Sequence, residues 1–463
     1  MEYRIEKDSL GELKVPVNAY YGVQTQRAVV NFPISGVRPH QDWVKATVLV
    51  KKAAAIVNRK LKLLDKKKAN AIIAACDEVL GGKLADQFVV DVYQAGAGTS
   101  HNMNTNEVLA NRAIEILGGK RGDYSLVNPN DEVNMAQSTN DVIPAVIRVS
   151  AILMTDKFLP VLADLEKSFL KKAKEFDHVI KSGRTHLQDA TPIRLGQEFS
   201  GYAACVRGHM DRIKRAREEL THLGIGGTAV GTGVNADPKY RAMMVKELSS
   251  LTGIGFKQAD NYFEAMQSMA GAAALSGALR NLALDITRIA NDLRLLGSGP
   301  RTGFAEVKLP AVQPGSSIMP GKVNPSILEM VNMVSFQVIG LDTTIAYAAQ
   351  AGQLELNVMM PVIGFDLTFA LEIYGNALRI LKNKCIDGIE ADEAVCKDFA
   401  EKSVSIVTAL TPHIGYLKAA EVVKEAVAKN KTIRAVLLEK QLVKEKLLDE
   451  ILDPFKLTEV GRH

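Results

Sequence analysis

The amino-acid sequence predicts a mainly α-helical protein of three domains with a central bundle of long helices, and three observations carry this prediction. The chain has 463 residues, which is more than one hydrophobic core usually supports. Hydrophobic residues make up 47% of the chain but aromatic residues only 6%, so aliphatic side chains of the kind that line helix seams must pack the core. Between Leu275 and Leu296, aliphatic residues recur at alternating spacings of four and three, which is the heptad pattern of a helix packed along its whole length.

The two ends of the chain differ from its centre. Residues 1–139 predict a mixed, mainly helical N-terminal domain, because their apolar pieces are short and a turn-rich stretch (VNPND) occupies residues 127–131. Residues 391–463 predict a small C-terminal helical domain of shorter, charged helices. The helical bundle is expected between them, at residues 140–390.

Three apolar stripes define the long helices of the central domain. They comprise Phe158, Leu162, Leu165, Phe169 and Ala173; Leu275, Leu279, Leu282, Ile286, Ile289, Leu293 and Leu296; and Ile327, Val331, Val334 and Val338. The second stripe ends at the sequence GSGP, so its helix could extend over ~50 Å at 1.5 Å per residue. Asn324 is the expected N-cap of the third helix, with Pro325 as its first residue. Such helices need several partners, so we expect helices of other subunits to complete the bundle and to bury the stripe from Leu275 to Leu296.

Charge and cysteine usage exclude several classes of protein. The net charge of +5 could bias the electrostatic field toward anionic substrates but does not indicate nucleic acid. Four cysteines lie far apart without a CxxC pair, which favours a reducing compartment over a disulfide framework or a zinc site. The N-terminus is polar, unlike a signal peptide, and no apolar run approaches membrane-spanning length. We therefore expect a cytoplasmic protein that binds neither membranes nor nucleic acid.

Four segments rich in small polar residues stand out between the predicted helices. They are GAGTS at residues 96–100, QSTND at 137–141, GRTH at 183–186 and GSSIMPGKVNP at 315–325. At least three immediately precede a helical pattern, and a helix N-terminus offers unpaired N–H donors and a partial positive charge to a carboxylate. For any one segment a simple capping role would be the better interpretation. Four such segments together favour an anion site.

The loop at residues 315–325 is the most specific of the four. Two glycines can act as hinges around the adjacent hydroxyls of Ser316 and Ser317, and Lys322 and Asn324 follow as a cation and an amide. A mobile flap could thus bring an oxygen base, a cation and a hydrogen-bond donor onto a substrate and exclude water, although an ordinary surface loop is the alternative. Five residues separate the glycines where a phosphate-binding loop has four, and Val323 stands where that motif has Ser or Thr. A serine hydrolase is disfavoured because no Gly-x-Ser-x-Gly elbow surrounds Ser316.

The sequence GSSIMPGKVNP resembles the signature loop of the aspartase/fumarase superfamily. The resemblance covers nearly the whole chain, from AYYGVQT at residues 19–25 through GRTHLQD at residues 183–189 to the C-terminal domain. It implies a homotetrameric lyase with a central helical bundle, in which each active site draws segments from three subunits. It also implies a small dicarboxylate substrate and a reaction that needs no metal, flavin or nicotinamide.

The resemblance implies a role for each matching polar residue. Ser316 is similar to the base that removes the proton next to the β-carboxylate of the substrate, a weakly acidic proton whose removal requires stabilisation of a dianionic aci-carboxylate. The hydroxyl donors to this intermediate are expected to be Thr99, Ser138, Thr139 and Ser317. The residues expected to bind the other carboxylate are Lys322, Asn324 and Thr185. His186 and Asn140 match positions near the leaving group, and Glu329 resembles the carboxylate that pairs with this histidine, although a structural role for Glu329 is nearly as well supported.

The choice within the superfamily lies mainly between releasing ammonia from L-aspartate and releasing water from L-malate. Segments 94–100, 351–357 and 451–455 resemble the ammonia-releasing members, whereas segments 226–231 and 296–301 are more similar to the water-releasing fumarases. Met360 replaces a glutamate common in the first group, and His101 is unusual for both. We favour L-aspartate as the substrate. The remote alternative is a non-catalytic structural protein on the same fold, against which the intact set of Ser316, Lys322, Asn324 and His186 argues.

Overall fold

The computed structural model describes residues 2–461 and is mainly helical, with four small two-stranded sheets among these residues. This confirms the predicted fold class. By its contacts the chain divides into two compact units. Unit 1 comprises Met1–Leu159, Asp211–Ala283 and Phe336–Gly375, and unit 2 comprises Pro160–Met210, Leu284–Ser335 and Asn376–His463. The three-domain division stays a prediction, because the two units divide the long helices instead of following its boundaries.

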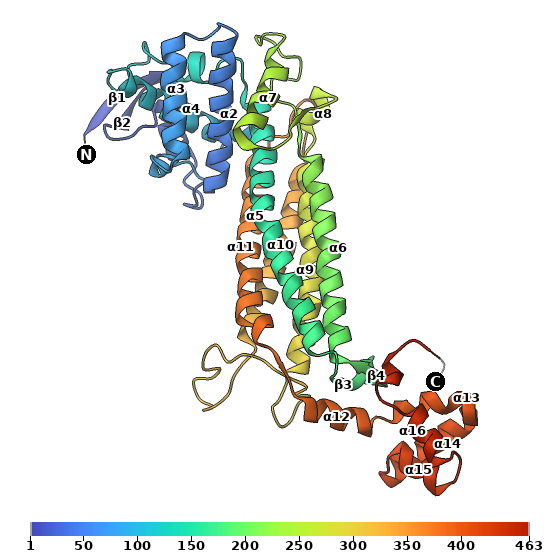
Figure 1. The fold of residues 1–463 in the computed structure, drawn as a ribbon. Coiled ribbons are helices and arrows are strands. Elements are labelled where there is room, and N and C mark those ends of the chain that lie inside the picture. Colours follow the sequence, from blue (N-terminus) through green and yellow to red (C-terminus); the bar gives the residue numbers. More distant parts are fainter. Residues whose placement is uncertain (1, 462–463) are drawn as a thin grey trace. The chain divides into compact units, whose positions relative to one another are not determined.

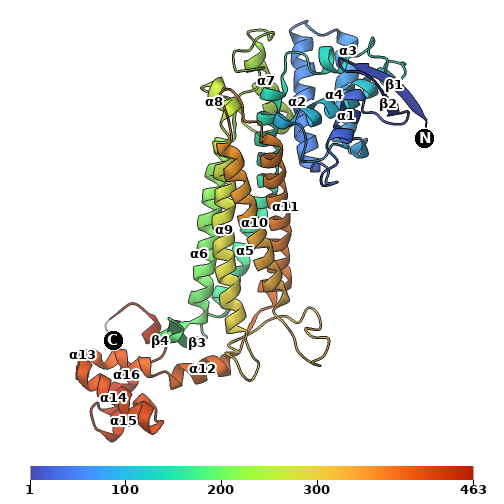
Figure 2. The same ribbon diagram turned by 180° about the vertical axis from the view of Figure 1, so that it is seen from behind.

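Five long helices contribute residues to both units. They are α5 (Thr139–Glu175), α6 (Leu195–Glu219), α9 (Ala270–Leu296), α10 (Ser326–Gln350) and α11 (Met360–Lys384). Within each unit, segments of these helices lie side by side (Figures 1 and 2). None of the helices in the described residues is long and apolar enough to cross a membrane.

The predicted stripes lie on these helices and are mostly buried. Every residue of the stripe from Leu275 to Leu296 is at most 7% exposed in a single chain. The expectation that neighbouring subunits bury this stripe is therefore wrong, because the chain's own side chains already cover it. On α10, Val331 and Val338 are buried while Ile327 and Val334 are half-buried.

Unit 1 begins with a hairpin and a cluster of helices. Its further elements are β1 (Tyr3–Asp8), β2 (Gly11–Pro16), α1 (Val23–Asn31), α2 (Gln41–Lys60), α3 (Lys66–Leu80), α4 (Thr99–Ile116), β5 (His222–Leu223), α7 (Tyr240–Thr252), β6 (Lys257–Gln258) and α8 (Tyr262–Gln267). Helices α2, α3 and α4 pack against one another around buried residues that include Ile72, Leu109 and Ile114. The only tryptophan, Trp43, packs so closely on Gly364 of α11 that a Cβ there would lie 2.1 Å from its ring.

Unit 2 carries two short antiparallel sheets and the C-terminal helices. Its further elements are β3 (Ile180–Thr185), β4 (Gln188–Arg194), β7 (Val307–Lys308), β8 (Glu390–Ala391), α12 (Glu393–Lys402), α13 (Thr411–Ile414), α14 (Tyr416–Lys429), α15 (Ile433–Glu439) and α16 (Glu445–Ile451). Strands β3 and β4 form a hairpin against which α12 packs. The fully buried Glu306 forms ion pairs with Lys181 and Arg184, which lie near the two ends of β3, and these pairs hold the strand in place.

Candidate functional site

The predicted site residues of unit 1 gather at two helix N-termini. Helix α4 begins at Thr99 after Gly98, whose φ of +86° places it in the left-handed region that glycine adopts without strain. Helix α5 begins at Thr139, directly after Ser138. Thr99 is exposed, whereas Ser138, Thr139 and Asn140 are half-buried. At least three of the four polar segments were predicted to precede a helix, and these two do. Each helix start directs backbone N–H groups toward the segment that carries these hydroxyls.

Asp141 holds the segment before α5 in place. Its Oδ1 accepts a hydrogen bond from the Ser138 N–H at 2.9 Å, and its Oδ2 accepts from the N–H groups of Gly226 and Thr228 at 2.8 and 3.0 Å. Burial raises the pKa of Asp141 to about 6, although these N–H donors favour the carboxylate. Asp141 was missed in the sequence analysis. The pattern Ser-x-x-Asp before an apolar run is a capping-box signal that could have found it.

Asn140 is oriented by a backbone carbonyl. Its side-chain nitrogen, Nδ2, donates to the carbonyl oxygen of Ala229 at 2.9 Å. This contact fixes which end of the amide faces the segment around Ala229. The carbonyl oxygen, Oδ1, is thus the acceptor that Asn140 can offer elsewhere.

A buried lysine lies behind the same segment. Lys51 on α2 is fully buried and donates from Nζ to the side-chain oxygens of Asn134 at 2.8 Å and Gln137 at 3.1 Å. Asn102 on α4 donates to Asn134 and to the Thr139 hydroxyl, at 3.3 and 3.2 Å. Burial lowers the pKa of Lys51 to about 7. No sequence signal identified Lys51, because its partners lie more than eighty residues away.

In unit 2, Thr185 and His186 lie at the tip of the β3–β4 hairpin and are exposed. His186 and Leu187 have φ values of +56° and +58°, so both central residues of this turn are left-handed, as in a type I′ turn. Non-glycine residues adopt this conformation at a cost that often marks a functional site. Arg184, one residue before the tip, is held by Glu306 at 2.9 Å and stacks over Phe304.

The loop at residues 315–325 is closed by hydrogen bonds within itself. The Gly315 N–H donates to the Lys322 carbonyl at 2.8 Å, and the Asn324 side-chain amide donates to the Gly315 carbonyl at 2.6 Å. Glycine is needed at position 315, because a Cβ there would lie 2.6 Å from the backbone nitrogen of Asn324. Helix α10 begins at Ser326, and the Pro325 carbonyl before it accepts from the Glu329 N–H at 3.1 Å, so the predicted helix start at Pro325 is one residue early.

Ser316 lies inside this loop and is half-buried. Its Oγ accepts hydrogen bonds from the backbone N–H groups of Ile318 at 3.2 Å and Met319 at 2.9 Å. Two such donors stabilise negative charge on the oxygen as its proton leaves, which is what a serine needs in order to act as a base. Ser317 and Lys322 are exposed on the same loop.

Glu329, on the second turn of α10, pairs with Arg294 of α9 at 3.8 Å. Among the described residues no ion pair or hydrogen bond joins it to His186 within the chain, so the expected pairing stays a prediction. The predicted residues thus form two groups. Thr99, Ser138, Thr139 and Asn140 belong to unit 1, and Thr185, His186, Ser316, Ser317, Lys322, Asn324 and Glu329 belong to unit 2.

A cavity of about 770 Å³ lies within unit 2, between the hairpin, α12 and the C-terminal helices. Its lining includes His178, Lys397 and Arg434 but none of the predicted site residues. The predicted residues are instead distributed over helix starts, a hairpin tip and a loop. In unit 1 the two helix starts offer N–H groups and hydroxyls to a carboxylate. In unit 2 the loop offers a lysine and one serine oxygen suited to removing a proton.

Comparison with known proteins gives full-length matches. A family model described as "Lyase" matches residues 11–340, and one described as "Fumarase C C-terminus" matches residues 406–459. The aspartate ammonia-lyase of Bacillus subtilis is 49% identical over 460 residues, which are 99% of this chain and 97% of that protein. The aspartate ammonia-lyase of Escherichia coli K12 is 48% identical over 97% of this chain and 94% of its own length.

Two solved structures resemble the chain over nearly its full length. One is a cobalt-bound fumarate lyase:delta crystallin from Brucella melitensis, with a TM-score of 0.97, 48% identity, and coverage of 99% of this chain and 100% of that one. The other is the class II fumarase of Schistosoma mansoni, with a TM-score of 0.96, 38% identity, and coverage of 99% of each chain.

Proposed function

Because the chain belongs to the aspartase/fumarase superfamily of lyases, we propose that it is a carbon–nitrogen lyase that reversibly eliminates ammonia from L-aspartate to give fumarate. The observation that carries this proposal is the full-length similarity to several aspartate ammonia-lyases. It exceeds the similarity to the class II fumarase. Hydration of fumarate to L-malate is therefore the second candidate, supported by the fumarase-like segments at residues 226–231 and 296–301.

We assign the base of this reaction to Ser316. The proton to be removed lies next to the β-carboxylate of aspartate and is weakly acidic, so the base must be strong and its product stabilised. The two N–H groups that donate to the Ser316 Oγ favour the alkoxide. The same closed loop carries Lys322, whose cation can attract the substrate carboxylate toward this oxygen.

The remaining polar groups would bind the two carboxylates. The dianionic aci-carboxylate needs several donors, and these would be the hydroxyls of Thr99, Ser138, Thr139 and Ser317 together with the N-termini of α4 and α5. The other carboxylate would be held by Lys322, Asn324 and Thr185. Acid–base chemistry and anion binding suffice for this elimination, so we propose that it needs no cofactor.

Asn140 and His186 would act at the amino group of the substrate. An ammonium ion requires hydrogen-bond acceptors, and the Asn140 amide already directs its nitrogen to the Ala229 carbonyl. Its carbonyl oxygen is therefore suited to an ammonium group. A neutral His186, supported by Glu329 of the same or another subunit, would supply a second acceptor.

We further propose that the protein is a homotetramer whose active sites each combine segments of three subunits. Support comes from one face of α10, on which Met333, Phe336 and Tyr347 are 64%, 58% and 68% exposed. Gly340 and Thr343 continue this face at heptad spacing, and the one charged residue between Met333 and Tyr347, Asp342, pairs with Arg280 of α9 instead. An uncharged stripe of this kind is covered in helix bundles, and a second copy of the same helix fits it. The four cysteines, none of them in a disulfide, are consistent with a cytoplasmic location.

The substrate proposal is tested by following fumarate absorbance with purified protein and no added cofactor. L-Aspartate should yield fumarate, while L-malate and D-aspartate should remain essentially untouched, and fumarate should be consumed only when ammonia is supplied. Turnover of L-malate far above that of L-aspartate would make the protein a fumarase.

The role of Ser316 is tested separately by Ser316→Ala. Removing the base should lower kcat by about 10²–10⁴-fold while a dicarboxylate inhibitor still binds, because the anion-binding groups remain. Ser200→Ala on the exposed face of α6 is the control and should behave like the unmodified protein. A Ser316→Ala variant that retains substantial turnover would remove Ser316 from the mechanism without affecting the assignment of the substrate.

A further inference from the structure

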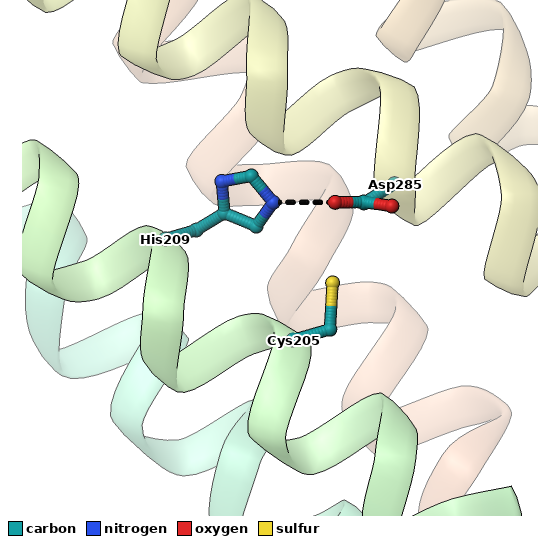
Figure 3. Close-up of side chains that lie close together, drawn as sticks. All are labelled: Cys205, His209 and Asp285. Carbon is teal, nitrogen blue, oxygen red and sulfur yellow. Dashed lines mark hydrogen bonds and ion pairs between the residues drawn. The ribbon is translucent and has the colours of Figure 1, made fainter.

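We propose that Cys205, His209 and Asp285 form a binding site for one divalent transition-metal ion of the zinc or cobalt class. All three residues belong to unit 2. Cys205 and His209 lie four residues apart on α6 and share a face of that helix, and Asp285 faces them from α9 (Figure 3). The thiol sulfur, one imidazole nitrogen and one carboxylate oxygen all lie within 4.8 Å of one another.

The positions of the three atoms are close to those that a metal ion requires. Tetrahedral zinc with bonds of about 2.0–2.3 Å holds its ligand atoms roughly 3.3–3.7 Å apart. The His209 Nε2 and the Asp285 Oδ2 are now 2.8 Å apart and hydrogen-bonded, so they must separate slightly, while the sulfur must approach. The His209 side chain is 3% exposed and anchors the site, whereas that of Asp285 is 38% exposed and Cys205 is half-buried. The two outer ligands can therefore adjust, and a water molecule can complete the coordination.

The donor set selects the class of metal. A thiolate, an imidazole and a carboxylate suit zinc and its neighbours, whereas magnesium and calcium prefer sites made only of oxygen atoms. With the thiol deprotonated and the imidazole neutral, the two negative charges of Cys205 and Asp285 balance a divalent cation. The lack of CxxC pairs argues against a four-cysteine site and leaves this mixed set open.

The positive charge of Arg288 lies close to the proposed metal site and would repel the ion unless it is neutralised. Arg288 follows Asp285 by one turn of α9, and its Nε lies 3.3 Å from the Asp285 Oδ1. The oxygen that faces His209 is the other one, Oδ2. Since Arg288 is 52% exposed and lies 3.6 Å from Asp292 as well, its charge can be neutralised there. The carboxylate of Asp285 can thus bind Arg288 through one oxygen and a metal through the other, an outer contact common at metal sites.

Metal binding would rearrange two protons. The hydrogen between His209 and Asp285 must leave the Nε2, because that nitrogen needs its lone pair for the metal, and in a neutral imidazole it moves to Nδ1. The Cys205 thiol loses its proton to solvent. One proton is therefore released for each ion bound, and the ion joins α6 to α9 within unit 2. None of the three residues is assigned to the elimination, so the site is expected to affect stability and not the chemistry of the reaction.

The proposal is tested on the full-length protein after chelation and dialysis. Cobalt titration should give one ion per chain, with visible bands of tetrahedral cobalt and a sulfur-to-cobalt charge-transfer band, and zinc should displace it and raise the apparent Tm. The other three cysteines are buried, so an alkylating reagent should react mainly with Cys205. Zinc should protect Cys205 from this reaction. Cys205→Ser should abolish the charge-transfer band, and Asp285→Asn should weaken binding at least tenfold. His178→Gln is the matched control, because His178 forms an exposed pair with Glu393.

Each result bears directly on the site. Wild-type protein that gives no charge-transfer band, or that binds cobalt equally well after Cys205→Ser, would overturn the proposal. If a variant does not fold, the cobalt spectrum of the wild type and the protection of its Cys205 still test the proposal, because both measurements report whether the thiolate binds the metal. Unchanged alkylation of Cys205 in saturating zinc would also contradict it.

Discussion

Asp141 is the residue whose replacement most directly tests how the site of unit 1 is held. In Asp141→Asn, one oxygen becomes an amide nitrogen that can only donate. In the better orientation the remaining oxygen still accepts from Gly226 and Thr228, and the new amide nitrogen faces the Ser138 N–H. Two donors, the half-buried Ser138 N–H and the new amide group, then lack an acceptor. At about 1–3 kcal/mol for each unsatisfied group, this predicts a cost of roughly 2–4 kcal/mol after some relaxation.

Hydrogen exchange measures this cost where it arises. Local opening of the segment before α5 should become roughly 30–700-fold more frequent, since each 1.4 kcal/mol is a factor of ten. Mass spectrometry at pH 8, above the pKa of about 6 that burial gives Asp141, should show the loss of protection in peptides that contain Ser138 and Gly226. The KM for L-aspartate should rise as well, because Ser138 begins the proposed substrate-binding segment.

The exposed Asp131 provides the control, because Asp131→Asn changes the same charge without touching these N–H groups. Peptides around Ser138 should then retain wild-type protection. If Asp141→Asn also retained wild-type protection and KM, the argument from unsatisfied donors would be refuted, and Asp141 would not position the segment.

Three further predictions concern assembly, packing and pH. Phe336→Lys should dissociate the proposed tetramer, and light scattering would measure the lower mass. If the variant remained a tetramer, α10 would not form the interface. Gly364→Ala should lower the apparent Tm, at a cost of about 1–3 kcal/mol for overpacking against Trp43, whereas Gly201→Ala, which meets no atom within 4 Å, should be neutral or stabilising. Lys51 has a pKa lowered from 10.5 to about 7 by burial, so charging it costs the folded state free energy. The stability of the wild type relative to Lys51→Met should therefore fall as the pH drops from 10.5 to 7 and stay level below; a pH-independent difference in Tm would contradict this.

Much of the backbone of the candidate site could be predicted because its signals are local in the sequence. The starts of α4 and α5 follow from small polar residues before apolar periodicity, and the loop around Ser316 follows from its glycines and hydroxyls. These features depend on backbone preferences and hydrogen bonds over a few residues. The start of α10 was placed one residue too early, because Pro325 precedes the helix and caps it through its carbonyl.

What only the tertiary structure decided are contacts between distant parts of the chain. The heptad stripe by itself determined that the segment from Leu275 to Leu296 is a long packed helix. Only the tertiary structure shows that other parts of the same chain cover this stripe. Lys51 behind Gln137 and Asp141 beneath Gly226 are 86 and 85 residues from their partners. Periodicity specifies which face of a helix is buried, and it does not specify what buries it. The choice of partner depends on the packing of the complete chain.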